Sequence, residues 1–232
     1  MSATPKPSNA APRRPPERPR TGVYKWFFAW LLSKLQRHYG EEVDKRKKEL
    51  LGALHGTVVE IGAGAGANLE FYPRDVRILL VEPNAHMRPY LDDAARKHDA
   101  SFEIRAGTAE RMEVADASVD FVVCTLVLCS VDDPEAALQE VVRVLKPGGR
   151  FIFLEHVAAA HGTETRKWQR RLRGFWRRIC DGCTLDRETW ARIEEAGFAT
   201  CDVEHFEAEN IPIAKPHIAG TATKAERAMV EV

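Results

Sequence analysis

The sequence predicts an α/β fold in which helices cover both faces of a doubly wound, mostly parallel sheet. Apolar runs of strand length alternate with charged segments of helical period along most of the chain. Two of these runs, at 57–61 and 76–82, bracket a turn with three glycines within residues 62–66. Polar residues gather where the expected strands end, and ligands bind at such ends in this class of fold. These observations predict a ligand site at the carboxyl edge of a parallel sheet.

Each expected element follows from a local pattern. Helical apolar spacing predicts the helices, and Met87 and Leu91 mark the inward face of one of them. Short, nearly continuous apolar runs predict buried parallel strands. The stop signal Lys146-Pro147-Gly148-Gly149 ends a helix before the fifth strand. In chain order we expect a helix at 41–54, a strand at 57–61, a helix beginning at 66–72, a strand at 76–82, a helix at 85–98, strands at 101–106 and 120–126, a helix at 134–145 and a strand at 150–155.

The chain divides into a tail, an N-terminal segment and one main domain. Residues 1–20 hold six of the thirteen prolines and four arginines with few large apolar side chains, which predicts a disordered tail. Residues 21–54 are expected to form an amphipathic, aromatic helical segment, and residues 55–232 the main domain. Within residues 21–39 the aromatic side chains are expected either to lie in a membrane interface or to pack over the ligand site, because the segment is too short to span a bilayer.

Charge distribution and cysteine usage limit the classes of binding partner, the cellular compartment and the metals to be expected. Lys and Arg together number 34, as do Asp and Glu, and residues 1–48 hold twelve basic against four acidic residues. Because the basic excess is local, no nucleic-acid partner is expected. Five cysteines without a paired framework indicate a reducing, cytoplasmic compartment, with peripheral membrane contact through residues 21–39 left open. Cys180-x-x-Cys183 lacks a second ligand pair in the sequence, so no metal is expected.

The loop after the first expected strand suits close contact with a ligand. Its glycines free the backbone from Cβ interference, and Glu82 lies twenty residues beyond Gly62, where α/β folds hold ribose hydroxyls. The spacing from Gly62 to Ala67 also fits a dinucleotide site. Glu60 decides between the two, because a carboxylate there repels a pyrophosphate and attracts a cation. S-adenosylmethionine carries a ribose, an ammonium and a sulfonium, so it accounts for both carboxylates.

Five motifs follow one another along the chain: Glu60-x-Gly-x-Gly-x-Gly66, Glu82, Gly107-Thr-Ala-Glu110, Asp120-Phe-Val-Val and Arg143-Val-Leu-Lys-Pro-Gly-Gly-Arg-Phe. In that order they resemble the class I S-adenosylmethionine-dependent methyltransferases. Further motifs are similar to the methyltransferase-like alkyl thiol S-methyltransferases, namely Cys124-Thr-Leu-Val-Leu-Cys-Ser-Val131, Glu155-His-Val-Ala158, Asp181-Gly-Cys183 and Pro216-His-Ile-x-Gly220. The resemblance implies that residues 55–232 form a Rossmann-like, seven-stranded sheet whose last strand, around 217–223, runs antiparallel.

The resemblance also implies a role for each matching residue. Glu60 is expected near the methionine ammonium, Glu82 on both ribose hydroxyls, and Thr108 beside the adenine where the family often has an aspartate. The expected cofactor site comprises Glu60, Gly62, Ala63, Gly64, Gly66, Asn68, Glu82, Pro83, Asn84, Met87, Thr108, Ala109, Glu110, Cys124, Thr125 and Leu126.

The opposite wall is expected to hold the methyl acceptor. Methyl transfer from a sulfonium is an in-line displacement that depends on positioning, so no protein nucleophile is needed. A thiol reacts as its thiolate, and we expect His156 to act as the base, oriented by Glu155 or Asp181. Cys129, His156, His217 and Trp168 are the expected substrate contacts. The basic, aromatic residues 166–178 are expected to form either a lid or a solvated helix.

Two classes of function remain open from the sequence. The first is S-adenosylmethionine-dependent methyl transfer to a small lipophilic acceptor, expected to be a thiol, with a lipid or a quinone as the alternative. The second is a cofactor-binding, membrane-associated module without catalysis. The intact glycines and both carboxylates favour the enzyme.

Overall fold

The computed structural model describes residues 22–35, 40–208 and 212–226. The expected disordered tail at 1–20 lies outside the described residues, as do residues 36–39 of the aromatic segment. Within the described part of the chain, no helix is both long enough and apolar enough to cross a membrane.

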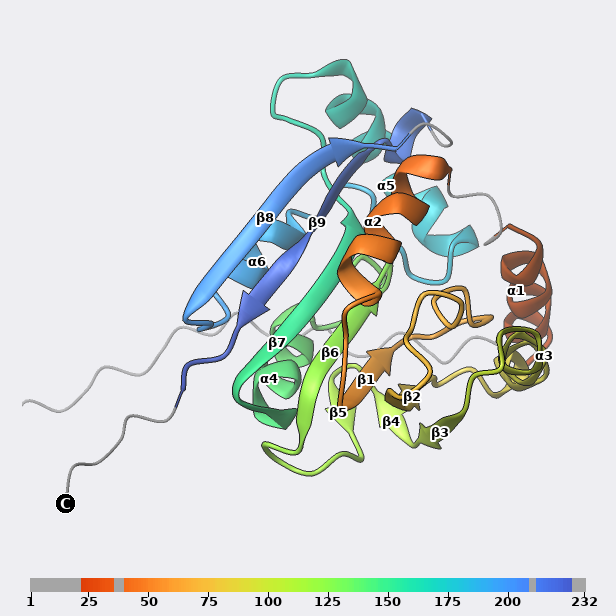
Figure 1. Ribbon diagram of the computed structural model, residues 1–232. Coiled ribbons are helices and arrows are strands. Elements are labelled where there is room, and N and C mark those ends of the chain that lie inside the picture. Colours follow the sequence, from red (N-terminus) through yellow and green to blue (C-terminus); the bar gives the residue numbers. More distant parts are fainter. Residues whose placement is uncertain (1–21, 36–39, 209–211, 227–232) are drawn as a thin grey trace, which may run out of the picture.

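A seven-stranded sheet forms the centre of the molecule (Figure 1). The first five strands in spatial order each pair in parallel with their neighbours, whereas the sixth strand runs antiparallel to both the fifth and the seventh. The expected mostly parallel sheet with an antiparallel last strand is therefore confirmed. In spatial order the strands are β3 (Phe102–Arg105), β2 (Arg77–Val81), β1 (Thr57–Ile61), β6 (Val119–Thr125), β7 (Leu145–His156), β9 (Pro216–Thr223) and β8 (Thr200–Glu207).

Helices cover both faces of this sheet because successive strand residues point to opposite sides. Val58 and Leu80 face a cluster with α2 (Glu41–Leu51) and α3 (Arg88–His98), which also includes Ala29 of α1 (Gly22–Leu35). Val59 and Phe153 face the other cluster, with α4 (Pro134–Val144) and α6 (Thr189–Glu194). The N-terminal helices thus contribute to the same packing as the sheet.

Several element boundaries depend on capping and turn residues. Asn84 caps the short 3-10 helix η2 (Ala85–Met87), which leads into α3, and both Met87 and Leu91 are buried as expected. Asp133 caps α4, and the helix ends at Val144 just before the stop signal. The basic segment forms one helix, α5 (Glu164–Ile179), capped by Thr163.

The expected helix start at 66–72 is wrong. The chain instead makes consecutive turns there, with backbone hydrogen bonds from Leu69 to Gly66 and from Phe71 to Asn68. Pro73 closes the segment before a helix can propagate, and the Asn68 and Tyr72 side chains are directed to Glu60. Sequence patterns also did not indicate β8, η3 (Pro212–Ala214) or the small hairpin of β4 (Gly107–Thr108) and β5 (Arg111–Met112).

Candidate active site

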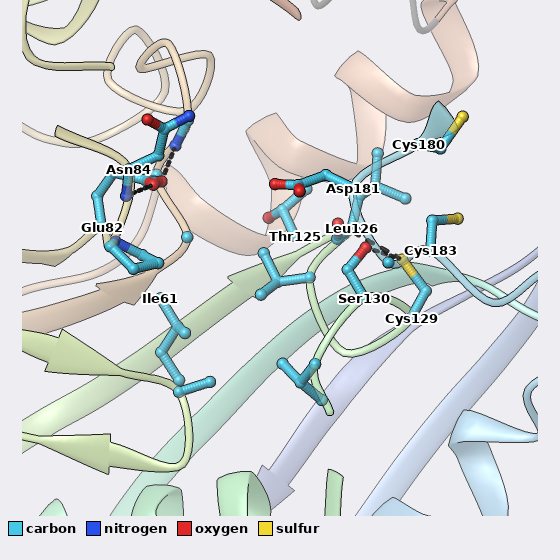
Figure 2. Close-up of a pocket in the computed structure, with 18 of the residues that line it drawn as sticks. Ile61, Glu82, Asn84, Thr125, Leu126, Cys129, Ser130, Cys180, Asp181 and Cys183 are labelled. Carbon is cyan, nitrogen blue, oxygen red and sulfur yellow. Dashed lines mark hydrogen bonds between the residues drawn. The ribbon is translucent and has the colours of Figure 1, made fainter. Parts of the chain in front are cut away.

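A cavity of about 1030 Å³ opens at the carboxyl edge of the sheet. The last residues of four parallel strands, Ile61, Val81, Thr125 and His156, all line it. Figure 2 shows Glu82 and Asn84 on one side of this cavity and Cys129 and Cys183 on the other, with Thr125 and Leu126 between them. One cavity therefore joins the expected cofactor wall to the expected acceptor wall.

Glu60 is a buried carboxylate at the end of β1, with 3% of its surface exposed. It accepts hydrogen bonds from the Asn68 amide and the Tyr72 hydroxyl, each at 2.9 Å. Burial raises the pKa of Glu60 to about 7, against the opposing effect of those two donors and of the Lys47 charge. A buried carboxylate held mainly by neutral donors suits a cationic group of a ligand.

The glycine loop and Glu82 form one hydrogen-bonded unit. The Gly64 N–H donates to one Glu82 oxygen at 2.9 Å, and the Asn84 N–H donates to the other at 2.8 Å. Gly62, at φ +64°, approaches Val127 so closely that a Cβ would lie 2.5 Å from a Val127 methyl carbon. Of the loop residues, Gly62, Ala63, Gly64, Ala67 and Asn68 line the cavity.

Gly66, the third glycine of the loop, was expected in the cofactor site but packs against α3 instead. Gly66 is not among the cavity-lining residues of the described chain. A Cβ on Gly66 would meet Ala94 at 2.9 Å and Leu91 at 3.4 Å, so this glycine permits close packing of the loop against α3. Its backbone N–H donates to Ala63 within the loop at 2.9 Å.

Two further groups of expected cofactor residues border the same space. Pro83, Asn84 and Met87 line the cavity beyond β2, and Thr108, Ala109 and Glu110 line it beyond β3. The Glu110 carboxylate accepts a hydrogen bond from the Asp132 N–H at 3.1 Å, which ties the small hairpin to the loop before α4.

Of the three cofactor residues expected at the end of β6, two line the cavity and one lies in the core. Thr125 and Leu126 line the cavity, and Leu126 adopts a left-handed backbone conformation at φ +59°. Cys124 is fully buried in the cluster around α4, so it does not line the cavity. The reason is strand alternation, because Cys124 points to the face opposite that of Val123.

The acceptor wall consists of buried sulfur and imidazole groups. Cys129, His156, Cys183 and His217 all line the cavity, and His156 Nε2 lies 2.9 Å from Cys183 Sγ. His156 and His217 are paired across β7 and β9, with ring centroids 6.2 Å apart. His217 Nδ1 lies 2.9 Å from the Lys215 carbonyl oxygen. His156 Nδ1 and His217 Nε2 are buried without a hydrogen-bond partner among the described residues.

The expected orientation of His156 by Glu155 or Asp181 is not what the structure shows. Glu155 is fully buried and accepts hydrogen bonds from the backbone N–H groups of Val127 and Leu128, each at 2.9 Å. As neighbours on β7, Glu155 and His156 point to opposite faces of the sheet. Asp181 lines the cavity, but its carboxylate pairs with Lys25 at 3.0 Å. Glu155 thus holds the loop that carries Cys129, and Asp181 connects to α1.

Helix α5 presents a different tryptophan from the one expected. Trp168 is 52% exposed and does not line the cavity, whereas Trp176, two turns later, does. The Trp176 indole N–H donates to Cys183 Sγ at 3.1 Å. The C-terminal end of α5 and the residues after it border the cavity, while much of the helix surface is exposed.

Sequence reasoning missed several cavity residues from the N-terminal helices. Lys25, Phe28 and Leu31 of α1 and Lys47 of α2 line the cavity. A signal for Lys47 was present, because Val43, Lys47 and Leu51 recur at helical spacing as the buried face of α2. A lysine in such an apolar stripe is unusual, and burial lowers its pKa. For α1, the aromatic pattern of residues 21–39 left open packing over the ligand site, and Phe28 does line the cavity.

Comparison with known proteins identifies the family of this chain. A family model described as a methyltransferase domain matches residues 59–153. The chain is 38% identical over 219 residues to the Homo sapiens thiol S-methyltransferase TMT1A, and the match covers 88% of this chain and 90% of that protein. The chain belongs to the thiol S-methyltransferase family. It is therefore an S-adenosylmethionine-dependent methyltransferase.

Solved structures agree at the level of the fold. A SAM-dependent methyltransferase from Aquifex aeolicus matches with a TM-score of 0.59 at 16% identity, over 85% of this chain and 97% of that chain. A SAM-dependent methyltransferase from Thermotoga maritima matches with a TM-score of 0.57 at 22% identity, over 86% and 99%. At these identities the similarity establishes the Rossmann-like architecture of the family.

The cavity residues fit the family's cofactor. Glu60 offers a buried carboxylate for an ammonium, and the hydrogen-bonded Glu82 offers one for ribose hydroxyls. Val127 leaves no space for a side chain at Gly62, so the backbone of the glycine loop packs directly against Val127. The space between these groups and the acceptor wall is continuous.

Proposed function

We propose that this chain transfers a methyl group from S-adenosylmethionine to the thiol of a small lipophilic molecule. The observation that carries the proposal is the single cavity in which the Glu60 and Glu82 carboxylates share a space with Cys129, His156 and His217. Relatives named as thiol S-methyltransferases cover nearly the whole chain and support a thiol acceptor.

The residues of the chain divide the work between binding and positioning. The cofactor, when bound, supplies the methyl group as a sulfonium substituent. Glu60 and Glu82 would hold its cationic and ribose ends, with Thr108 to Glu110 beside the adenine. Phe28, Leu31 and Trp176 give the cavity apolar surface for a lipophilic acceptor. Positioning of the acceptor sulfur in line with the methyl group is then the main requirement of the reaction.

A panel of acceptors tests the proposal directly. Full-length protein is incubated with tritium-labelled cofactor and with matched aliphatic thiols, the corresponding alcohols, phenols, a quinone and phospholipids. Transfer to the thiols and not to the alcohols of equal shape is expected. Transfer only to phospholipid or quinone would establish the alternative acceptor, and cofactor binding by calorimetry without any transfer would indicate a non-catalytic module.

We also propose that α1 docks peripherally on a membrane surface. Trp26, Phe27 and Trp30 are 56%, 48% and 43% exposed on this helix. Two contacts hold α1 beside the end of α5. Lys25 forms an ion pair with Asp181, and the Tyr24 hydroxyl donates a hydrogen bond to the Ile179 carbonyl oxygen. Phe175 and Ile179 of α5 are also exposed. Large exposed apolar groups beside a cavity suit an amphipathic segment at a membrane interface, from which a lipophilic acceptor can enter.

Liposome flotation distinguishes this proposal from a freely dissolved enzyme. The triple variant Trp26→Ser, Phe27→Ser, Trp30→Ser is expected to lose flotation with phosphatidylserine-containing liposomes. Ile104→Ser serves as the matched control, because Ile104 is an exposed apolar residue on β3. Equal flotation of the triple variant and the control would contradict membrane docking through α1.

A further inference from the structure

We propose that Cys129, His156 and Cys183 bind a zinc ion at the acceptor end of the cavity, with one coordination position open to the substrate. The inference departs from the sequence expectation of no metal. Its catalytic part rests on the proposed thiol methylation, whereas the metal site itself is independent of it.

The three side chains meet in a geometry that suits zinc. Their ligand atoms all lie within 4.8 Å of one another, and His156 Nε2 and Cys183 Sγ are 2.9 Å apart. Tetrahedral zinc with ordinary Zn–S and Zn–N bonds places such atoms about 3.5–3.8 Å from one another. Small side-chain shifts therefore reach coordination geometry. Two sulfurs and one imidazole form a ligand set that favours zinc over Ca²⁺ or Mg²⁺.

Each ligand comes from a different element, and the backbone holds these elements together. Cys129 lies in the loop after β6, His156 ends β7, and Cys183 follows α5. The Thr184 N–H donates to the Cys129 carbonyl oxygen at 2.8 Å, which joins the two cysteine loops directly. The Cys129 N–H donates to Glu155 at 3.3 Å, next to His156. The donor groups are thus arranged before any ligand binds, as a metal site requires.

Hydrogen-bond donors and a positive charge lie around the two sulfurs, and zinc binds cysteine as the thiolate. The Trp176 indole N–H donates to Cys183 Sγ at 3.1 Å. The partly buried Arg187 guanidinium donates to the carbonyl oxygens of Leu128 and Val131, at 3.0 Å for the latter, and its charge acts on Cys129. Zinc with two thiolates and one neutral imidazole has no net charge, so such a site can be buried.

An open fourth position gives the site its function. All three ligands line the cavity, and a structural zinc site would use a fourth protein ligand instead. The described residues offer no fourth Cys, His, Asp or Glu ligand atom in this cluster. A substrate thiol that takes the position loses its proton to water as the S–H bond breaks and a Zn–S bond forms. The bound sulfur keeps lone pairs for the incoming methyl group, and the cofactor leaves as the neutral thioether.

Zinc content of the full-length protein tests the site itself. Protein prepared with reductant and without chelator is loaded with ZnCl₂, dialysed and analysed by plasma mass spectrometry. We expect about one zinc per chain in the wild type and in Cys201→Ser, a partly buried cysteine on β8 outside the cluster. Cys129→Ser and Cys183→Ser each remove a zinc ligand. They are expected to weaken zinc binding more than the roughly 10–100-fold that follows from loss of a residue that only hydrogen-bonds to a ligand. Co²⁺ loading should give full thiolate charge-transfer absorption in the wild type and in Cys201→Ser, and a weaker band or none in Cys129→Ser and Cys183→Ser.

Two outcomes would overturn the inference. One is wild-type protein that holds no zinc after loading, including the case in which intact mass shows a Cys129–Cys183 disulfide under reducing conditions. The other is equal zinc affinity in Cys129→Ser, Cys183→Ser and Cys201→Ser. Calorimetric cofactor binding at the glycine loop shows that each variant is folded. Zinc bound without any thiol methylation would refute the proposed function and leave the metal site standing. Methylation by zinc-free protein at the wild-type rate would refute the catalytic role of the zinc and leave the proposed function standing.

Discussion

The backbone N–H of Gly64 and the carboxylate of Glu82 lie 2.9 Å apart, although 18 residues separate them along the chain. The hydrogen bond joins the loop after β1 to the end of β2 and fixes the Glu82 side chain at the edge of the cavity. A second donor, the Asn84 N–H, holds the other carboxylate oxygen. The carboxylate is thereby oriented before the cofactor binds.

Replacement of Glu82 by glutamine should weaken cofactor binding by about 10–100-fold. The amide has the same size but loses the charge, and one hydrogen bond to a charged group contributes about 1.5–3 kcal/mol. Calorimetric titration with S-adenosylhomocysteine measures the change. Glu103→Gln on β3 is the control, because that carboxylate is exposed and pairs with Arg77. Unchanged affinity in Glu82→Gln would show that this carboxylate does not contact the ribose.

The free energy of unfolding of the cofactor-free protein should fall with pH because of Glu60. Its pKa is about 7 in the folded chain, where it faces Asn68, Tyr72, Lys47 and Glu82, and near 4.5 when unfolded. Between these values the folded chain retains a proton that the unfolded chain has released, so stability decreases as pH rises through this window and then levels off. The loss amounts to roughly 3 kcal/mol.

Urea unfolding at pH 5, 6, 7 and 8 checks this dependence. The difference between the wild type and Glu60→Gln isolates the contribution of Glu60, because other titrating groups are common to both proteins. A difference that stays constant from pH 5 to pH 7 would rule out a raised pKa at this position.

Cofactor binding should become tighter as pH rises toward 7. A cation beside Glu60 favours the ionised carboxylate, so binding below pH 7 must release a proton from this buried group. Affinity is then expected to change by up to about tenfold per pH unit below pH 7. Calorimetry in two buffers of different ionisation enthalpy measures the released proton. Glu60→Gln should bind the cofactor more weakly and release no proton on binding. Proton release by that variant would show that the proton comes from another group.

Gly62→Ala should destabilise the protein more than Gly197→Ala. Both glycines have positive φ, at +64° and +88°, but a Cβ at Gly62 meets Val127 at 2.5 Å whereas nothing lies within 4 Å at Gly197. The strained conformation costs about 1–2 kcal/mol at either position, and the clash adds about 1–3 kcal/mol at Gly62. Thermal unfolding compares the two variants. Relative to Val127→Ala, the double variant Gly62→Ala, Val127→Ala should lose only the stability cost of the strained backbone, because the clash with the Val127 methyl groups is removed. If Gly62→Ala costs as much in the Val127→Ala background as in the wild type, the whole cost lies in the backbone conformation.

Local patterns predicted the parts of the fold that depend on local physics. Met87 and Leu91 were recognised as an inward helix face because their spacing matches the helical repeat, and Pro147 and Gly148 mark the stop signal just beyond α4. The same reasoning failed at 66–72, where the side chains of Asn68 and Tyr72 hydrogen-bond to Glu60, 8 and 12 residues earlier in the chain, and helical periodicity does not indicate such contacts.

The sequence by itself determined the α/β class, the glycine loop and the two carboxylates of the cofactor wall, because these depend on strand periodicity and on residues close together in the chain. Only the tertiary structure decided which face Glu155 and Cys124 occupy, that Trp176 replaces Trp168 in the cavity, and that Cys129, His156 and Cys183 meet. The reason is physical: the acceptor wall is assembled from strand ends and loops that are far apart in the sequence, and packing of the whole sheet brings them together.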